Sequence, residues 1–153
     1  VVLIYPFYEL APGNVARYNS AAVIDADGTV LGAYRKSHIP EDDGWFEKYY
    51  FAEGDTGFRV WKTRYATIGV GICWDQWFPE SHRLLTLAGA QVLFFPTAIG
   101  YGPVPRWWGD KWQMLSWHDV QIGQSIANSV PIVVSNRHGA ELDPRRPRNI
   151  TFW

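Results

Sequence analysis

The chain has 153 residues, of which 47% are hydrophobic, and its 14 basic and 15 acidic side chains leave a formal net charge of -1. This length and composition predict one domain, residues 1–153, and the balanced charge argues against nucleic acid or a membrane surface as a partner. A single cysteine excludes an internal disulfide and a cysteine-only metal cage, and it suits a reducing compartment, so a cytoplasmic location is expected.

The first half of the chain has the composition of a β-sheet. Runs rich in β-branched and aromatic residues, separated by turn signals, predict strands at Val1–Tyr5, Tyr18–Asp25, Thr29–Lys36, Phe58–Lys62 and Tyr65–Ile72. The tetrapeptide "DADG" at 25–28 predicts a hairpin, because Asp27-Gly28 readily adopts the positive φ values of a tight turn.

The second half alternates helices with strands. Pro79 suits a first helical position, and Leu84, Leu87 and Ala88 then fall at helical spacing before Gly89. A strand at 91–96 follows, so the order strand, helix, strand implies a parallel sheet and an α/β fold.

A second helix is predicted from 109 to 128, with Leu115, Ile122 and Ile126 on its packing face and Gly123 and Ala127 permitting close approach. Strands are expected at 130–136 and 149–153.

No segment is long and apolar enough for a membrane span, and the opening "VVLIYPFYEL" lacks the features of a signal peptide. Both ends instead suggest strands entered or left midway.

Cys73 and Lys36 are the two side chains that suggest chemistry. Cys73 follows an apolar strand and precedes a helix, which places its thiol at the sheet edge where α/β proteins bind ligands. A helix N-terminus and a nearby ammonium would both favour the nucleophilic thiolate. The alternatives stay open here, because a lone cysteine is often a small buried hydrophobe and most lysines are solvated.

Six blocks, taken in order, resemble the nitrilase or carbon-nitrogen hydrolase superfamily. They are "YRKSHIP", "WFEKYYFAEGDTGF", "IGVGICWDQWFPE", "GAQVLFFPTAIG", "IANSVPIVVSNRHG" and "ITFW". The blocks "CWDQWFPE" and "EGDTGF" are most similar to the N-carbamoylputrescine amidase branch, which removes a carbamoyl group from a polyamine.

The resemblance implies a four-layer αββα sandwich and a thiol-dependent amidase that uses no metal and no cofactor. It implies that Cys73 is the nucleophile, that Lys36 stabilises the oxyanion with the backbone N–H of Trp74, and that Glu47 is a supporting glutamate. The family's general-base glutamate belongs to a block before Val1, and Glu9 lies in the wrong block to replace it. A whole domain of this type has about 250 residues or more, so the chain is expected to be an interior fragment that is inactive alone.

The residues after the cysteine bear on the substrate, which is expected to be a small carbamoyl or amide compound. Gln76 and Trp77 occupy positions where relatives acting on carbamoyl amino acids have an arginine pair that would bind a carboxylate. Their identity favours a cationic tail, which Trp77 could contact through its ring and which the acidic loop 41–43 could meet. Trp77 is equally suited to simple packing. Asp75 could pair with a substrate ammonium, although a cap is the favoured interpretation.

Several alternatives remain at this level. The four histidines, His38, His82, His118 and His138, lack paired metal-ligand spacing. The tryptophan-rich segment 106–117 could stack a base or sugar, although packing or a subunit interface is favoured, and a homo-oligomer is expected. A nitrilase or aliphatic amidase would use the same thiolate. A non-catalytic relative kept for assembly is the alternative of another class.

Overall fold

Two β-sheets face each other in the computed structural model, which describes residues 1–42, 45–101, 110–141 and 150–152. The first sheet is antiparallel, in the order β1 (Leu3–Leu10), β2 (Arg17–Ile24), β3 (Val30–Arg35). The second has the order β10 (Ile132–Asn136), β8 (Val92–Thr97), β7 (Thr67–Val70), β6 (Val60–Lys62). Within it, β10, β8 and β7 run parallel and β6 is antiparallel to β7.

The β2–β3 hairpin forms where "DADG" predicts it. Gly28 has φ 92° and donates its N–H to the Asp25 carbonyl at 2.9 Å, while Asp27 accepts the Thr29 N–H at 2.9 Å. These are the local bonds that aspartate and glycine contribute to tight turns. The predicted strands are thus confirmed in place, although β1 extends to Leu10 and β6 and β7 are shorter than expected.

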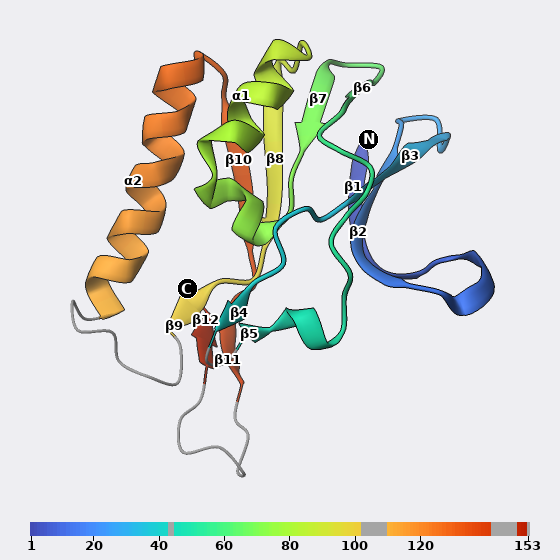
Figure 1. The fold of residues 1–153 in the computed structure, drawn as a ribbon. Helices are drawn as coiled ribbons and strands as arrows, with labels where there is room; N and C mark the ends of the chain where they lie inside the picture. Colours follow the sequence, from blue (N-terminus) through green and yellow to red (C-terminus); the bar gives the residue numbers. More distant parts are fainter. Residues whose placement is uncertain (43–44, 102–109, 142–149, 153) are drawn as a thin grey trace.

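Two helices, α1 (Pro79–Leu87) and α2 (Asp110–Asn128), lie on the side of the second sheet that faces away from the first (Figure 1). The predicted parallel β-α-β order around the cysteine is confirmed, because α1 connects β7 to β8.

The predicted packing faces of both helices are wrong. Leu84 and Leu87 are 51% and 67% exposed, and Ile122 and Ile126 are 45% and 73% exposed. Gly123 has no neighbour that an added Cβ would meet. The residues that α1 buries are Ser81, His82 and Leu85, so the helix turns a mixed polar and apolar face to the interior.

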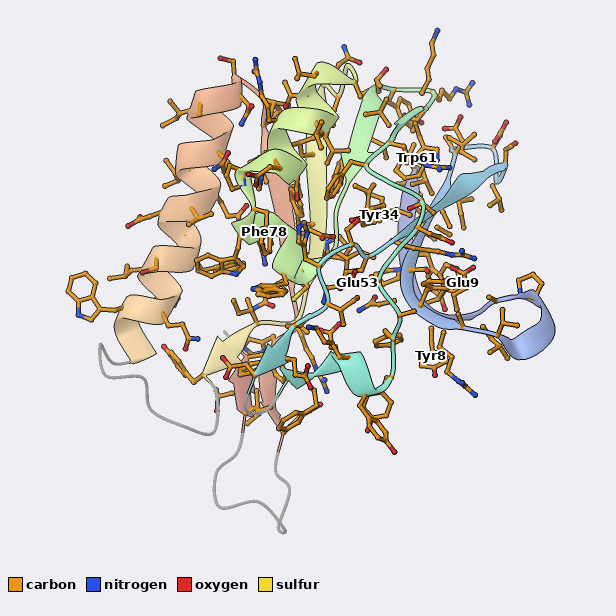
Figure 2. The ribbon with its side chains drawn as sticks, viewed as in Figure 1. Tyr8, Glu9, Tyr34, Glu53, Trp61 and Phe78 are labelled. Carbon is orange, nitrogen blue, oxygen red and sulfur yellow. The ribbon has the colours of Figure 1, made fainter. Side chains whose placement is uncertain are left out.

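The core has two parts, one on each face of the second sheet. Between the sheets lie Ala21, Val23, Tyr34, Trp61, Ile68, Val70 and Ile72. Beneath α1 lie Leu85, Ala90, Leu93, Phe95 and Val130. The side-chain view places Tyr34 in the interior and Glu9 and Tyr8 on β1 (Figure 2).

The molecule is therefore an α/β sandwich of two sheets with a helix layer over one of them. Within the described residues, the outer helix layer expected over the β1–β2–β3 sheet has no member. Short elements complete the described chain: η1 (Pro12–Asn14), β4 (Glu41–Asp42), β5 (Trp45–Phe46), η2 (Glu47–Tyr49), η3 (Cys73–Trp77), β9 (Gly100–Tyr101), β11 (Gly139–Glu141) and β12 (Ile150–Phe152). None of the described helices is long and apolar enough to cross a membrane.

Candidate active site

Cys73 begins the 3-10 turn η3, directly beyond the carboxyl end of β7. Its φ is +48°, a left-handed conformation that costs a residue with a Cβ about 1–3 kcal/mol and persists only where the surroundings hold it. The side chain is partly buried, and its Sγ lies 3.9 Å from the carbonyl oxygen of Ala98. The sequence placed Cys73 at this sheet edge, but the strained backbone came only from the structure.

Different neighbours of the thiol shift the pKa of Cys73 in opposite directions. Burial raises the pKa of Cys73, and the Lys36 ammonium lowers it by a smaller amount. The negative charges of Glu47 and Asp75 raise the same pKa further. The site was expected to favour the thiolate. That expectation is wrong, because the contributions that raise the pKa of Cys73 outweigh those that lower it.

Lys36 is buried and paired with Glu47. Its side chain has no exposed surface, and Nζ lies 2.7 Å and 2.9 Å from the two carboxylate oxygens of Glu47. Asn19 donates from Nδ2 to Glu47 Oε2 at 3.2 Å, so the carboxylate is held from two sides. The role of Glu47 as the supporting glutamate stays a prediction, to which this pairing gives a physical basis.

The Lys36 backbone is fixed as firmly as its side chain. Its N–H donates to the Asn19 carbonyl and its carbonyl accepts the Gly54 N–H, each at 2.8 Å. A Cβ at Gly54 would lie 2.1 Å from the Arg35 carbonyl oxygen, so only glycine permits this approach.

A cavity of about 590 Å³ opens beside the cysteine. Its wall consists of Pro40, Glu41, Asp42, Trp45, Cys73, Trp74, Trp77, Ala98, Ile99, Gln113 and Ser116. The volume suits a small molecule, and the mix of aromatic, aliphatic and acidic side chains suits an apolar chain that carries a positive charge. Asp43 lies outside the described residues.

Of the three residues expected to contact the substrate, Trp74, Gln76 and Trp77, two line the cavity and one does not. Trp74 and Trp77 both line the cavity. Gln76 is fully buried, and its Oε1 accepts a hydrogen bond from Gln121 Nε2 of α2 at 3.1 Å. Gln76 therefore faces the helix layer, and the cavity wall does not include it.

Asp75 is also fully buried, which removes the possibility that it pairs with a substrate ammonium. Its Oδ2 accepts the Ile72 N–H at 2.9 Å, which closes a capping box at the start of η3. The favoured interpretation as a cap of the helix that follows is wrong, because the N-cap of α1 is Phe78 and that helix has no side-chain cap. The same carboxylate accepts the Tyr34 hydroxyl at 2.8 Å and the His38 N–H at 3.0 Å. Its Oδ1 lies 2.7 Å from His38 Nδ1.

Glu9 forms a separate ion pair. Its Oε1 lies 2.5 Å from Arg35, and its Oε2 accepts the Ser20 hydroxyl at 2.5 Å. Arg35 also contacts Asp55 at 2.8 Å. The side-chain bond from Arg35 is the main cause that lowers the pKa of Glu9, so this glutamate is an ion-pair partner and not a free base.

Comparison with known proteins identifies the family. The sequence model of the carbon-nitrogen hydrolases matches residues 1–152. The chain belongs to the carbon-nitrogen hydrolase family. It is 52% identical to an N-carbamoylputrescine amidase of Arabidopsis thaliana, with 100% of this chain and 50% of the relative covered. It is 50% identical to a citrullinase of Francisella tularensis, over 94% of this chain and 48% of that protein.

Solved structures of this hydrolase family agree with the fold. The chain superposes on a carbon-nitrogen hydrolase from Helicobacter pylori G27 with a TM-score of 0.92 and 42% sequence identity, covering 99% of this chain and 52% of the other. The chain thus spans about half the length of the curated relatives it matches.

Sequence reasoning missed Asn19, Tyr34 and His38. Tyr34 and His38 had a usable signal, because residues two apart in an extended segment share one face, and both flank Lys36 at that spacing. Asn19 had none, since its contact with Glu47 joins residues 28 positions apart. Among the described residues, no group of three or more histidine, cysteine, aspartate or glutamate side chains could hold a metal ion.

Proposed function

We propose that the protein containing this chain hydrolyses the terminal carbamoyl group of a cationic carbamoyl amine, with N-carbamoylputrescine as the substrate. The observation that carries this proposal is the cavity wall, in which Cys73 lies together with the acidic pair Glu41 and Asp42 and the aromatic rings of Trp74 and Trp77. A thiol that shares one cavity wall with acidic and aromatic groups matches a molecule that carries both an electrophilic carbon and an ammonium.

In the proposed reaction, the Cys73 thiolate attacks the carbamoyl carbon and forms a tetrahedral oxyanion. Lys36 and the backbone N–H of Trp74 stabilise that oxyanion, and ammonia leaves after gaining a proton. Water then cleaves the thioester to regenerate the thiol, and the released carbamate decomposes to carbon dioxide and the amine. Glu47 keeps the Lys36 ammonium in place throughout.

A general base is required, because burial raises the pKa of the Cys73 thiol and keeps it protonated. Glu47 is bound to Lys36 and Asn19, and Asp75 accepts several hydrogen bonds, so neither is available for this role. We therefore place the base in a glutamate outside the 153 residues, and the inactivity of the isolated segment remains a prediction.

Citrulline is the second candidate substrate, because one relative at 50% identity is a citrullinase. N-carbamoylputrescine is citrulline without its carboxylate, so the two differ in a single charged group. Glu41 and Asp42 in the cavity wall oppose a carboxylate, which favours the decarboxylated compound.

The test is ammonia release by the full-length protein from four compounds: N-carbamoylputrescine, citrulline, N-carbamoyl-β-alanine and a simple aliphatic nitrile. We expect kcat/KM for N-carbamoylputrescine to exceed each of the others by at least about tenfold, equivalent to roughly 1.4 kcal/mol. Equal rates on the acidic and cationic compounds would remove the polyamine assignment. Preference for the nitrile would favour the nitrilase alternative, and no turnover of any compound would favour the non-catalytic one.

The cytoplasmic location and the homo-oligomer also remain predictions. Support for the oligomer comes from apolar side chains that α1 and α2 expose, namely Leu84, Leu87, Trp112, Ile122 and Ile126. Residues 106–109 of the tryptophan-rich segment lie outside the described residues.

A further inference from the structure

The Asp75 carboxylate joins the two chain segments that carry the candidate nucleophile and the candidate oxyanion donor. Each of its oxygens accepts one backbone N–H. Oδ1 accepts from His38 at 3.0 Å, and Oδ2 accepts from Ile72 at 2.9 Å. His38 lies two residues after Lys36, and Ile72 immediately precedes Cys73. One fully buried side chain therefore bonds both segments directly.

Two side-chain contacts strengthen the same connection. The Tyr34 hydroxyl, two residues before Lys36, donates to Oδ2 at 2.8 Å and accepts the Ser37 N–H at 3.1 Å. His38 Nδ1 lies 2.7 Å from Oδ1, and the imidazole stacks on Phe78 with ring centroids 3.7 Å apart. Phe78 directly follows η3, so the stack also links the Lys36 segment to the cysteine turn.

These contacts bear on the position of Cys73 relative to Lys36. Cys73 has a left-handed backbone, and its side chain packs against the core with Sγ 3.9 Å from the Ala98 carbonyl oxygen, so its orientation depends on the turn around it. Lys36 belongs to the other sheet and is held there by Glu47, Asn19 and Gly54. An oxyanion donor is effective only at a fixed distance from the carbon under attack, and displacement by about 1 Å can cost 10²-fold in rate.

We propose that Asp75 is a positioning residue for the hydrolysis reaction, which fixes the Lys36 segment against the Cys73 turn through His38, Tyr34 and Ile72. The inference rests on the proposed function for its kinetic consequence, but the geometry of the thiol can be tested without turnover. The alternative is that Asp75 stabilises the fold and has no particular effect on the placement of these two groups.

Asp75→Asn is the informative substitution, because it keeps the size of the side chain. Backbone N–H groups cannot reverse their polarity, and each carboxylate oxygen receives one of them. The amide NH₂ group must therefore face a donor in either orientation, which breaks the bond to one segment. Tyr34→Phe removes a single hydroxyl from the same cluster and leaves the Asp75 charge in place.

The experiment uses the full-length protein and two readouts at a temperature below unfolding. The first is kcat and KM for N-carbamoylputrescine. The second is the rate of Cys73 alkylation by iodoacetamide as a function of pH, which reports the thiolate fraction. Leu85→Ala, in the core beneath α1, is the control for lost stability away from the turn.

For Asp75→Asn we expect kcat to fall by at least about 10²-fold with KM changed less than about threefold. Tyr34→Phe should lower kcat by about tenfold or less, and Leu85→Ala should keep wild-type kcat per folded molecule. The alkylation midpoint should move to higher pH in both cluster variants, because Lys36 no longer lies in its wild-type position beside the thiol. Loss of the Asp75 charge alone would move the midpoint of Asp75→Asn to lower pH, so the sign separates the two explanations.

Wild-type kcat and midpoint in Asp75→Asn would overturn the proposal, as would a midpoint that moves to lower pH. An equal loss of kcat in Leu85→Ala would also overturn it, because general destabilisation would then explain the effect. If the wild-type protein releases no ammonia from any compound, the proposed function fails, and the direction of the alkylation midpoint alone decides the positioning role.

Discussion

The buried ion pair of Lys36 and Glu47 and the acidic part of the cavity wall are built differently. In the buried pair, Lys36 has no exposed side-chain surface and Glu47 is 20% exposed, and the two are joined through both carboxylate oxygens. In the cavity wall, Glu41 is 59% exposed and its ion pair with Lys48 is 3.9 Å long. The charges of the buried pair stand at fixed positions in a poorly solvated setting, where electrostatic effects are large, whereas solvent screens the charges of the wall. We infer that substitutions in the buried pair change the rate of the reaction and substitutions in the acidic wall change substrate choice.

The largest effect is expected at the nucleophile. Cys73→Ser in the full-length protein should abolish ammonia release and leave the melting temperature nearly unchanged, because a hydroxyl fits the site but lacks the nucleophilicity of a thiolate. Steady-state ammonia release and thermal unfolding measure the two outcomes. Product release at the wild-type rate would rule out the proposed mechanism.

The next effect is expected at Lys36. Lys36→Ala should lower kcat by at least about 10²-fold, the scale for losing an oxyanion donor. It also leaves the Glu47 carboxylate without its main partner. Lys62→Ala, an exposed lysine on β6, is the matched control and should keep wild-type kinetics. A change confined to KM would mean that Lys36 only binds substrate, and the contrast between the buried pair and the acidic wall would then fail.

A smaller effect is expected in the acidic wall of the cavity. Glu41→Gln should raise KM for N-carbamoylputrescine by about two- to fivefold and leave kcat unchanged, because a screened surface charge contributes about 1 kcal/mol or less. KM for citrulline should rise less, since its carboxylate is repelled by the same charge. Glu53→Gln is the control, because Glu53 is exposed and lies outside the cavity wall. Equal shifts in Glu41→Gln and Glu53→Gln would show that net charge alone matters.

The smallest effect is expected at Glu9, away from the cavity. Arg35 holds the folded-state pKa of Glu9 below its ordinary value of 4.5. The stabilisation is therefore present above pH 4.5 and is lost as the pH falls through the folded-state pKa. Glu9→Gln should lower the melting temperature by a few degrees at neutral pH and by less in acid. The same loss at both ends of the pH range would show that packing, and not the ion pair, provides the stabilisation.

Much of the fold follows from the sequence, because strand period, turn residues and helix caps act over short distances. The hairpin at Asp27-Gly28 and the start of α1 at Pro79 appear where local rules place them. The two-residue strands β4, β5 and β9 were not predicted, since such short segments lack enough residues to show a period.

The candidate site, like the fold, has features that the sequence predicted and features that only the structure showed. The family blocks placed Cys73, Lys36 and Glu47, and the structure joins the last two directly. Gln76 and Trp77 are adjacent in sequence, yet one packs against α2 and the other lines the cavity. The direction of a side chain in a tight turn depends on the layers above and below it, and no local pattern encodes that.

By itself, the sequence determined the order of strands and helices, the family and the candidates for the reactive side chains. Only the tertiary structure decided that Ile122 and Ile126 face outward and that burial raises the pKa of the Cys73 thiol. It also decided that Asp75 bonds the Lys36 segment. The physical reason is the distance along the chain over which each effect acts. Periodicity and local hydrogen bonding act between near neighbours. Burial and the pKa of a buried group depend on contacts between distant residues, such as His38 and Asp75, which are 37 positions apart.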